Sequence, residues 1–206
     1  MTPPASFIYF NDLTPEASFL WASDSIEDCL GYTPEEIVGW SAYSLLFKED
    51  IPVTRTSHHE HVLNDFVASQ AIIAHRHKDG GRILIEVVFS TCHDFIACCG
   101  IVLDADDRTS GAKLQHNASL TFNSTLRSRQ FERLRRHNIA SKTGTWDTKD
   151  LLLEPRVCII LNRFSRSLEV LYASPLCELL LHIDAQAIEG KPLLLIRADD
   201  LVSFVE

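Results

Sequence analysis

The 206-residue sequence has no long hydrophobic run and no excess of basic residues, and each absence excludes a class of protein. No apolar stretch approaches the ~20 residues that cross a bilayer as a helix, so we expect no contact with a membrane. The N-terminus, Met1-Thr2-Pro3-Pro4, lacks the basic and apolar segments of a secretory signal, which predicts an intracellular protein of the nucleus or cytoplasm. Because 28 acidic residues outnumber 19 basic ones, the net charge is −9, which argues against a chain-wide nucleic-acid-binding surface.

Closely paired cysteines and catalytic motifs are also missing. The six cysteines are Cys29, Cys92, Cys98, Cys99, Cys158 and Cys177. They form no C-x-x-C pair, and most lie inside apolar runs, which favours buried free thiols over a disulfide framework or a zinc site. The sequence contains no nucleophile elbow, phosphate loop or paired-carboxylate motif. We therefore predict no catalytic residue, no metal site and no enzyme activity.

Charge divides the chain into three parts. Residues 1–105 hold five Lys or Arg against fifteen Asp or Glu, residues 106–150 hold nine against five, and residues 151–206 hold five against eight. The middle part is poor in apolar runs, so we predict a basic linker over 106–153 between two acidic modules. Its segment 126–136 has apolar residues spaced for a short amphipathic helix. Its arginines suit either docking on the acidic first module or contact with phosphates, and no base-reading fold accompanies them.

The first part has the pattern of an α+β domain. The predicted strands are 7–10, 18–22, 71–77, 82–92 and 95–103, and the predicted helices are 24–30, 33–38, 42–47 and 51–64. Glycines end the first two helices, and Lys78-Asp79-Gly80-Gly81 is a hairpin turn between long strands. Two short strands, a group of short helices and three long strands predict an antiparallel sheet with one face covered by helices.

The chain also contains an internal repeat. Leu20-Trp21-Ala22-Ser23 aligns with Leu171-Tyr172-Ala173-Ser174, and the same register carries Gly39 onto Gly190. The second copy reaches Glu206 at the point where the first copy enters its long helix. We therefore expect the tail to build only the first half of the same domain.

These patterns resemble the PAS family. In residues 6–105 the resemblance rests on Gly31-Tyr32-Thr33-Pro34-Glu35-Glu36-Ile37-Val38-Gly39 and on Lys78-Asp79-Gly80 before a strand. Residues 154–206 resemble the N-terminal half of a second PAS domain through Ile188-Glu189-Gly190-Lys191-Pro192. The tandem arrangement is similar to fungal PAS proteins of the white-collar and related transcription-regulator type. The resemblance implies a five-stranded antiparallel sheet flanked by short helices. It also implies a non-enzymatic sensory, signalling and protein-interaction module in transcriptional regulation.

The strand 82–92 has apolar residues on both faces. Ile83, Ile85, Val87 and Phe89 share one face, and Leu84, Glu86 and Val88 share the other. A strand with two apolar faces needs two covers. We predict that a protein partner, or a second copy in a homodimer, binds at Ile83, Ile85, Val87 and Phe89. The linker of the same chain is the alternative cover.

Cofactor binding has three candidate forms. Flavin-binding members of the family form a cysteinyl adduct, but Ala42 and Leu193 stand where the reactive cysteine would be, which argues against that chemistry. Noncovalent flavin binding stays open. Haem-binding members use a histidine of the long helix, and His58 is the candidate ligand here, with solvated histidines on an exposed helix as the alternative. We predict no cofactor, with a haem or another small ligand in the first PAS pocket as the alternative.

His75 and His77 have a spacing that could chelate a metal ion. They lie two residues apart on a predicted strand, but the sequence offers no third ligand. A polar outward face is the commoner explanation for such a pair, so they add no metal site to the prediction.

Overall fold

The computed structural model describes residues 5–103, 120–122, 146–151, 153–162 and 165–193. The chain forms two compact units, Met1–Leu153 and Glu154–Glu206. The predicted amphipathic helix at 126–136 and the end of the repeat at 194–206 lie outside the described residues. Within the described residues, no helix combines the length and the hydropathy needed to cross a bilayer.

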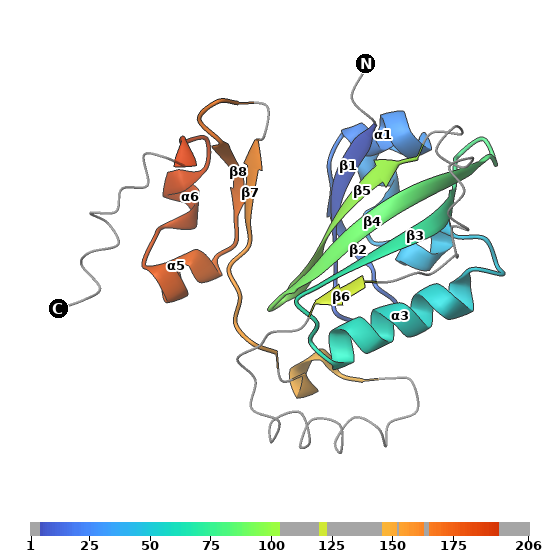
Figure 1. Ribbon diagram of the computed structural model, residues 1–206, viewed down its shortest axis with the longest axis horizontal. Helices are drawn as coiled ribbons and strands as arrows, with labels where there is room; N and C mark the ends of the chain where they lie inside the picture. The colour runs from blue at the N-terminus through green and yellow to red at the C-terminus, as the bar shows by residue number, and fades with distance from the viewer. Residues whose placement is uncertain (1–4, 104–119, 123–145, 152, 163–164, 194–206) are drawn as a thin grey trace. The chain divides into compact units, whose positions relative to one another are not determined.

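The first unit is built on an antiparallel sheet (Figure 1). Its strands are β1 (Ser6–Asn11), β2 (Phe19–Ala22), β3 (Ala68–Arg76), β4 (Arg82–Cys92), β5 (Phe95–Val102) and β6 (Leu120–Phe122). The order is β2-β1-β5-β4-β3-β6, and every pair is antiparallel. The five predicted strands are therefore confirmed. The sixth, β6, comes from inside the segment predicted as a linker and extends the sheet at the β3 edge.

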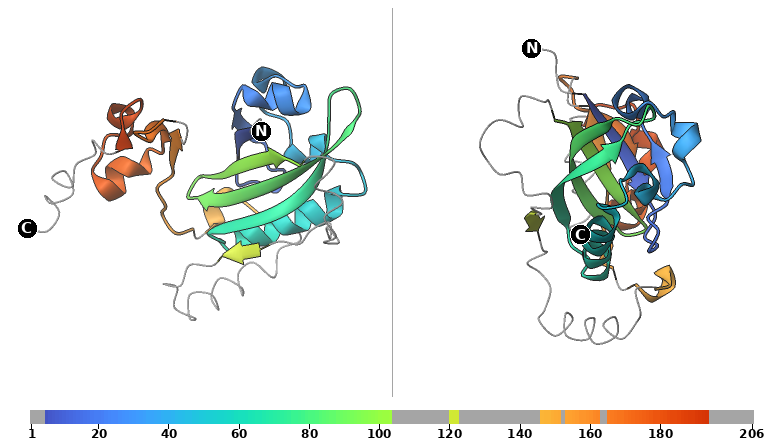
Figure 2. Two further views of the ribbon diagram at one scale, coloured as in Figure 1. Left: turned by 45° about the horizontal axis from the view of Figure 1, so that its top comes forward. Right: turned by 90° about the vertical axis from the view of Figure 1, so that its right-hand side faces the viewer.

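Four short helices lie on one side of this curved sheet (Figure 2). They are α1 (Ser25–Leu30), α2 (Pro34–Ile37), η1 (Ala42–Leu45) and α3 (Ile51–Leu63). A capping box between Thr33 and Glu36 begins α2. Gly31 ends α1 with a φ of 78°, a backbone conformation that favours glycine. A Cβ there would also lie 2.9 Å from His77 Cε1, so the His77 ring would have to move.

The core lies between the helices and the inner face of the sheet. The face of β4 that was predicted to bind a partner lies in this core. Ile85, Val87 and Phe89 are 0%, 1% and 8% exposed and pack in this core, whereas Val88 on the other face is 42% exposed. The predicted interaction surface of Ile83, Ile85, Val87 and Phe89 is therefore wrong. Alternation separates the two faces of a strand, but it does not show which one the helices cover when both are apolar.

The described part of the second unit has the same order of elements as the start of the first unit, two strands followed by two short helices. It contains β7 (Ile159–Asn162), β8 (Glu169–Ala173), α5 (Leu176–Leu181) and α6 (Ala185–Ile188). In the first unit Phe19 N donates to Trp40 O at 2.8 Å, and Val170 N donates in the same way to Lys191 O at 3.0 Å. The bond from Gly39 N to Phe19 O recurs as the bond from Gly190 N to Val170 O, both at 2.8 Å. The sequence repeat therefore extends to equivalent backbone hydrogen bonds.

Candidate ligand pocket

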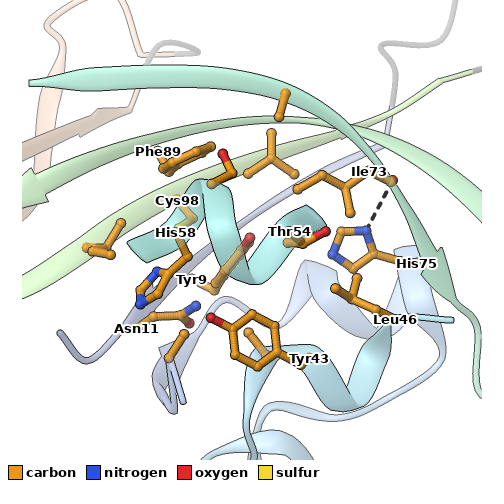
Figure 3. Close-up of a pocket in the computed structure, with 16 residues that line it drawn as sticks. Tyr9, Asn11, Tyr43, Leu46, Thr54, His58, Ile73, His75, Phe89 and Cys98 are labelled. Carbon is orange, nitrogen blue, oxygen red and sulfur yellow. Dashed lines mark hydrogen bonds between the residues drawn. The ribbon is translucent and has the colours of Figure 1, made fainter. Parts of the chain in front are cut away.

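A pocket lies between the inner face of the sheet, η1 and α3 (Figure 3). The cavity has a volume of about 70 Å³. The 16 lining residues are Tyr9, Asn11, Ala17, Ala42, Tyr43, Leu46, Thr54, Ser57, His58, Ala71, Ile73, His75, Val87, Phe89, Ile96 and Cys98. Two residues of the predicted interaction surface, Val87 and Phe89, thus form part of the pocket wall. The lining contains no Asp, Glu, Lys or Arg.

His58, the predicted haem ligand, lies on α3 and lines this pocket. It is 9% exposed, and its Nε2 lies 2.9 Å from the carbonyl oxygen of Thr14, to which it donates. Burial lowers the pKa of His58 to about 4, so the imidazole is neutral at pH 7.

The expectation of solvated histidines on this helix is wrong for two of its three histidines. His61 is only 1% exposed, and its Nδ1 lies 2.8 Å from Ser69 Oγ, so it is buried like His58. His59 is half-buried, and its Nε2 lies 3.3 Å from Pro15 O. Helix α3 therefore presents imidazole rings to the interior of the unit.

His75 also lines the pocket, from β3. It is 6% exposed, and its Nδ1 lies 3.3 Å from the carbonyl oxygen of Ile73, which makes Nδ1 the protonated nitrogen. Burial lowers the pKa of His75 to about 4. His77 lies beyond the end of β3 and places its Nδ1 2.8 Å from Asp79 Oδ1, so the two histidines serve different sites. The described part of the chain contains no group of three or more potential metal-binding side chains.

Asn11 brings an amide into the pocket from the end of β1. The residue is 6% exposed, and its Oδ1 is buried with no hydrogen-bond partner among the described residues. The predicted strand 7–10 ended one residue before Asn11, so this role was missed. The period-two pattern of Phe7 and Tyr9, extended by one step, would have placed Asn11 on the inner face.

Three further side chains add polar atoms to the wall of the pocket. Burial raises the pKa of Tyr9 and that of Cys98 well above their usual ranges, and the two side chains share a hydrogen bond. Tyr43 donates its hydroxyl to Pro15 O at 3.2 Å. Each of these three groups thus has a protein partner, whereas Asn11 Oδ1 has none among the described residues.

A segment from the predicted linker packs beside the pocket. Trp146 donates its Nε1 hydrogen to Leu13 O at 2.8 Å, one residue before the Thr14 carbonyl that His58 uses. Its ring centroid lies 6.3 Å from that of His58 and 4.7 Å from that of His59. Leu151 and Leu153 also pack against the core of the first unit. This end of the predicted linker, which includes η3 (Thr148–Asp150), therefore belongs to the first unit.

Comparison with known proteins identifies the fold of the first unit. Residues 19–94 match the family model described as PAS fold. The PAS-B domain of Drosophila melanogaster Cycle, solved with bound ethylene glycol, has 24% identity and a TM-score of 0.43, over 47% of this chain and 99% of that one. The PAS domain of the Cronobacter turicensis RpfR quorum-sensing receptor, solved with BDSF, has 13% identity and a TM-score of 0.44, over 50% and 99%.

A third similar structure is a LOV protein. The Rhodobacter sphaeroides LOV protein has 12% identity and a TM-score of 0.45, over 51% of this chain and 63% of that one. A search of curated proteins found no match. The family match at residues 19–94, together with the five-stranded antiparallel sheet and its short helices, shows that the first unit has the PAS fold, the fold of a family of sensory and signalling domains.

Proposed function

We propose that the first unit is a non-enzymatic sensor that binds a small molecule in the pocket and transmits its occupancy to the segment 146–153. The observation that carries this proposal is the position of His58. It lines the pocket, bonds to Thr14 O and stacks near Trp146, which bonds to the neighbouring carbonyl of Leu13. A ligand that moves His58 therefore also disturbs the loop at Leu13 and Thr14 and the His58 ring, and Trp146 contacts both.

The dimensions of the pocket favour a small ligand over haem or flavin. An engineered cavity of about 150 Å³ is known to hold benzene, and the volume here is about 70 Å³. Haem and flavin are much larger than benzene, and this difference in size supports the choice of a smaller ligand. His58 Nε2 is also engaged with the Thr14 carbonyl, and the methyl group of Ala42 lines the pocket where the flavin-binding relatives have a thiol.

Trp146 provides the test of this proposal. The chain has three tryptophans, and Trp21 and Trp40 are 46% and 42% exposed, so the double variant Trp21→Phe/Trp40→Phe leaves Trp146 as the only indole. With pyrrole as the probe, we expect saturable binding by NMR and a parallel shift in Trp146 emission. Ala71→Leu, which adds volume inside the pocket, should reduce both responses.

Two results would overturn the proposal. Absence of saturable binding for every neutral small ring would show that the pocket is not a ligand site. Binding that leaves the emission of Trp146 unchanged would show that occupancy does not reach the segment 146–153.

Binding of a protein partner or a second copy, and a role in transcriptional regulation like that of the fungal white-collar type, stay predictions from the resemblance. The same holds for a second PAS module at 154–206. If the sheet of the first unit binds a partner, we propose the outer face, where Val88 and Cys99 are paired across β4 and β5 and both are exposed. Val88→Glu should then abolish association measured by light scattering, whereas unchanged association would exclude this face.

A further inference from the structure

Asn11 is a polar side chain in an apolar pocket and has no bonding partner for its carbonyl oxygen among the described residues. Buried polar atoms in native proteins nearly always have a hydrogen-bond partner, so a buried Oδ1 without one indicates a missing donor. The side chain projects into the space between Tyr9, His58 and Tyr43 (Figure 3). A donor that reaches Asn11 Oδ1 from that space would satisfy it.

A second acceptor faces the same cavity. His75 uses Nδ1–H toward Ile73 O, so its Nε2 carries a lone pair, and that nitrogen points into the pocket (Figure 3). Asn11 and His75 therefore bring acceptors from β1 and β3, which lie on opposite sides of β5 and β4 in the sheet. A molecule between them can donate to either side chain.

The pocket offers nothing to balance a charge. None of its lining residues is acidic or basic other than histidine, and the two histidines are buried and neutral at pH 7. An ion entering the pocket would lose its hydration without gaining a counter-charge. The volume of about 70 Å³ is less than half of the ~150 Å³ that holds benzene, which favours a ligand smaller than benzene.

From these contacts we infer that the pocket selects a small neutral molecule, smaller than benzene, that donates a hydrogen bond from N–H or O–H to Asn11. The inference rests on the proposed function, because it assigns a ligand class to the same pocket. It goes further because it names Asn11 Oδ1 as the atom that distinguishes ligands with a donor from ligands without one. A ring of the same size without a donor leaves Asn11 Oδ1 unsatisfied and binds more weakly.

Pyrrole and furan provide a matched pair for the test. Both are neutral five-membered rings, and pyrrole donates N–H whereas furan has no donor. In ligand-observed NMR titrations of the full chain at pH 7, we expect pyrrole to bind about tenfold more tightly than furan, the upper end for one hydrogen bond. Pyrrolidine, which is a cation at this pH, should show no saturable binding.

Variants of the full chain then assign the discrimination to Asn11. Asn11→Leu, of similar size, should bring the pyrrole and furan affinities to within about twofold of each other. Asn64→Leu is the matched control, because Asn64 lies outside the pocket and bonds to Glu60 O at the end of α3. Asn64→Leu should keep the full difference between the pyrrole and furan affinities.

The possible results separate this inference from the proposed function. Equal affinities for pyrrole and furan in the unaltered chain, tighter binding of furan, or saturable binding of pyrrolidine would each overturn the ligand class and leave a ligand pocket in place. Failure of both neutral rings to bind would overturn the proposed function itself. The comparison in the unaltered chain decides the question even if Asn11→Leu does not fold.

Discussion

At the scale of single residues, the buried polar groups were the hardest to predict. The composition of α3 suggests an exposed helix because most of its side chains are polar. Spacing of four, seven and eight residues from Thr54 nevertheless selects His58, His61 and Val62, and these three are the buried residues of the helix. The polar composition of α3 therefore predicts an exposed helix, whereas the spacing of its residues identifies the buried face. The neutral state of His58 depends on its burial, which the sequence did not reveal.

The buried histidines predict a loss of stability between pH 7 and pH 5. The pKa of His58 and that of His75 are lowered from 6.5 to about 4, so in this range the unfolded chain binds more protons than the folded one. The free energy of unfolding should therefore decrease as the pH falls, by about 2 kcal/mol per histidine at pH 5. Urea unfolding at the two pH values measures this change.

His75→Leu should remove about half of this pH dependence, because a leucine side chain binds no proton. His93→Asn is the control: His93 is exposed at the turn between β4 and β5, and asparagine tolerates its positive φ of 42°. A pH dependence that stays unchanged in His75→Leu would contradict the assignment of the effect to the pocket.

At the scale of elements, the sequence predicted each strand and helix of the first unit's PAS fold but not which face of β4 is buried or what the linker does. Period-two alternation and the glycines of the intervening turn located β3, β4 and β5. The pairing of β6 with β3 depends on contacts across about fifty residues of sequence, and the three residues Leu120–Phe122 are too few for a recognisable strand pattern. The contact of Trp146 with Leu13 was equally hard to predict, because it joins residues 133 apart in the sequence.

The inner face of β5 is closely packed at Gly100, and a methyl group there should destabilise the sheet. A Cβ at Gly100 would lie 2.8 Å from Phe7 Cζ and 3.1 Å from Ile85 Cγ2, both in the core. We expect Gly100→Ala to lower the free energy of unfolding by about 1–3 kcal/mol. Urea unfolding at pH 7 measures it.

Gly81→Ala is the matched control for Gly100→Ala. Its Cβ would approach the flexible Asp79 side chain at 3.0 Å, with His77 Cβ at an ordinary contact distance of 3.9 Å, and the position is exposed. We expect a change of less than about 1 kcal/mol. Equal effects of the two substitutions would mean that the core relaxes around the new methyl group.

At the scale of the whole molecule, the two units share a bonding pattern but differ in the core that supports it. Among the residues that the structure describes, the main core cluster of the first unit contains 17 buried hydrophobic residues, and that of the second contains four, Val170, Ala173, Cys177 and Ile188. The sequence repeat predicted the shared pattern because it preserves the strand, the helix cap and the glycine. It did not predict the difference in burial, which depends on the strands β3, β4 and β5 that close the first unit.

The shared hydrogen bonds allow the two cores to be compared within one molecule. The amides of Phe19 and Val170 make equivalent bonds, to Trp40 O at 2.8 Å and to Lys191 O at 3.0 Å, so the local geometry is the same. Exchange of such an amide with solvent requires opening of the surrounding structure, and the cost of opening rises with the buried core. A two-stranded sheet is only marginally stable by itself. In hydrogen-exchange NMR of the full chain we therefore expect Val170 to exchange at least about a hundredfold faster than Phe19, after correction for intrinsic rates. Similar protection at both amides would contradict this expectation and give the second unit a stability that the four buried hydrophobic residues of its described part do not explain.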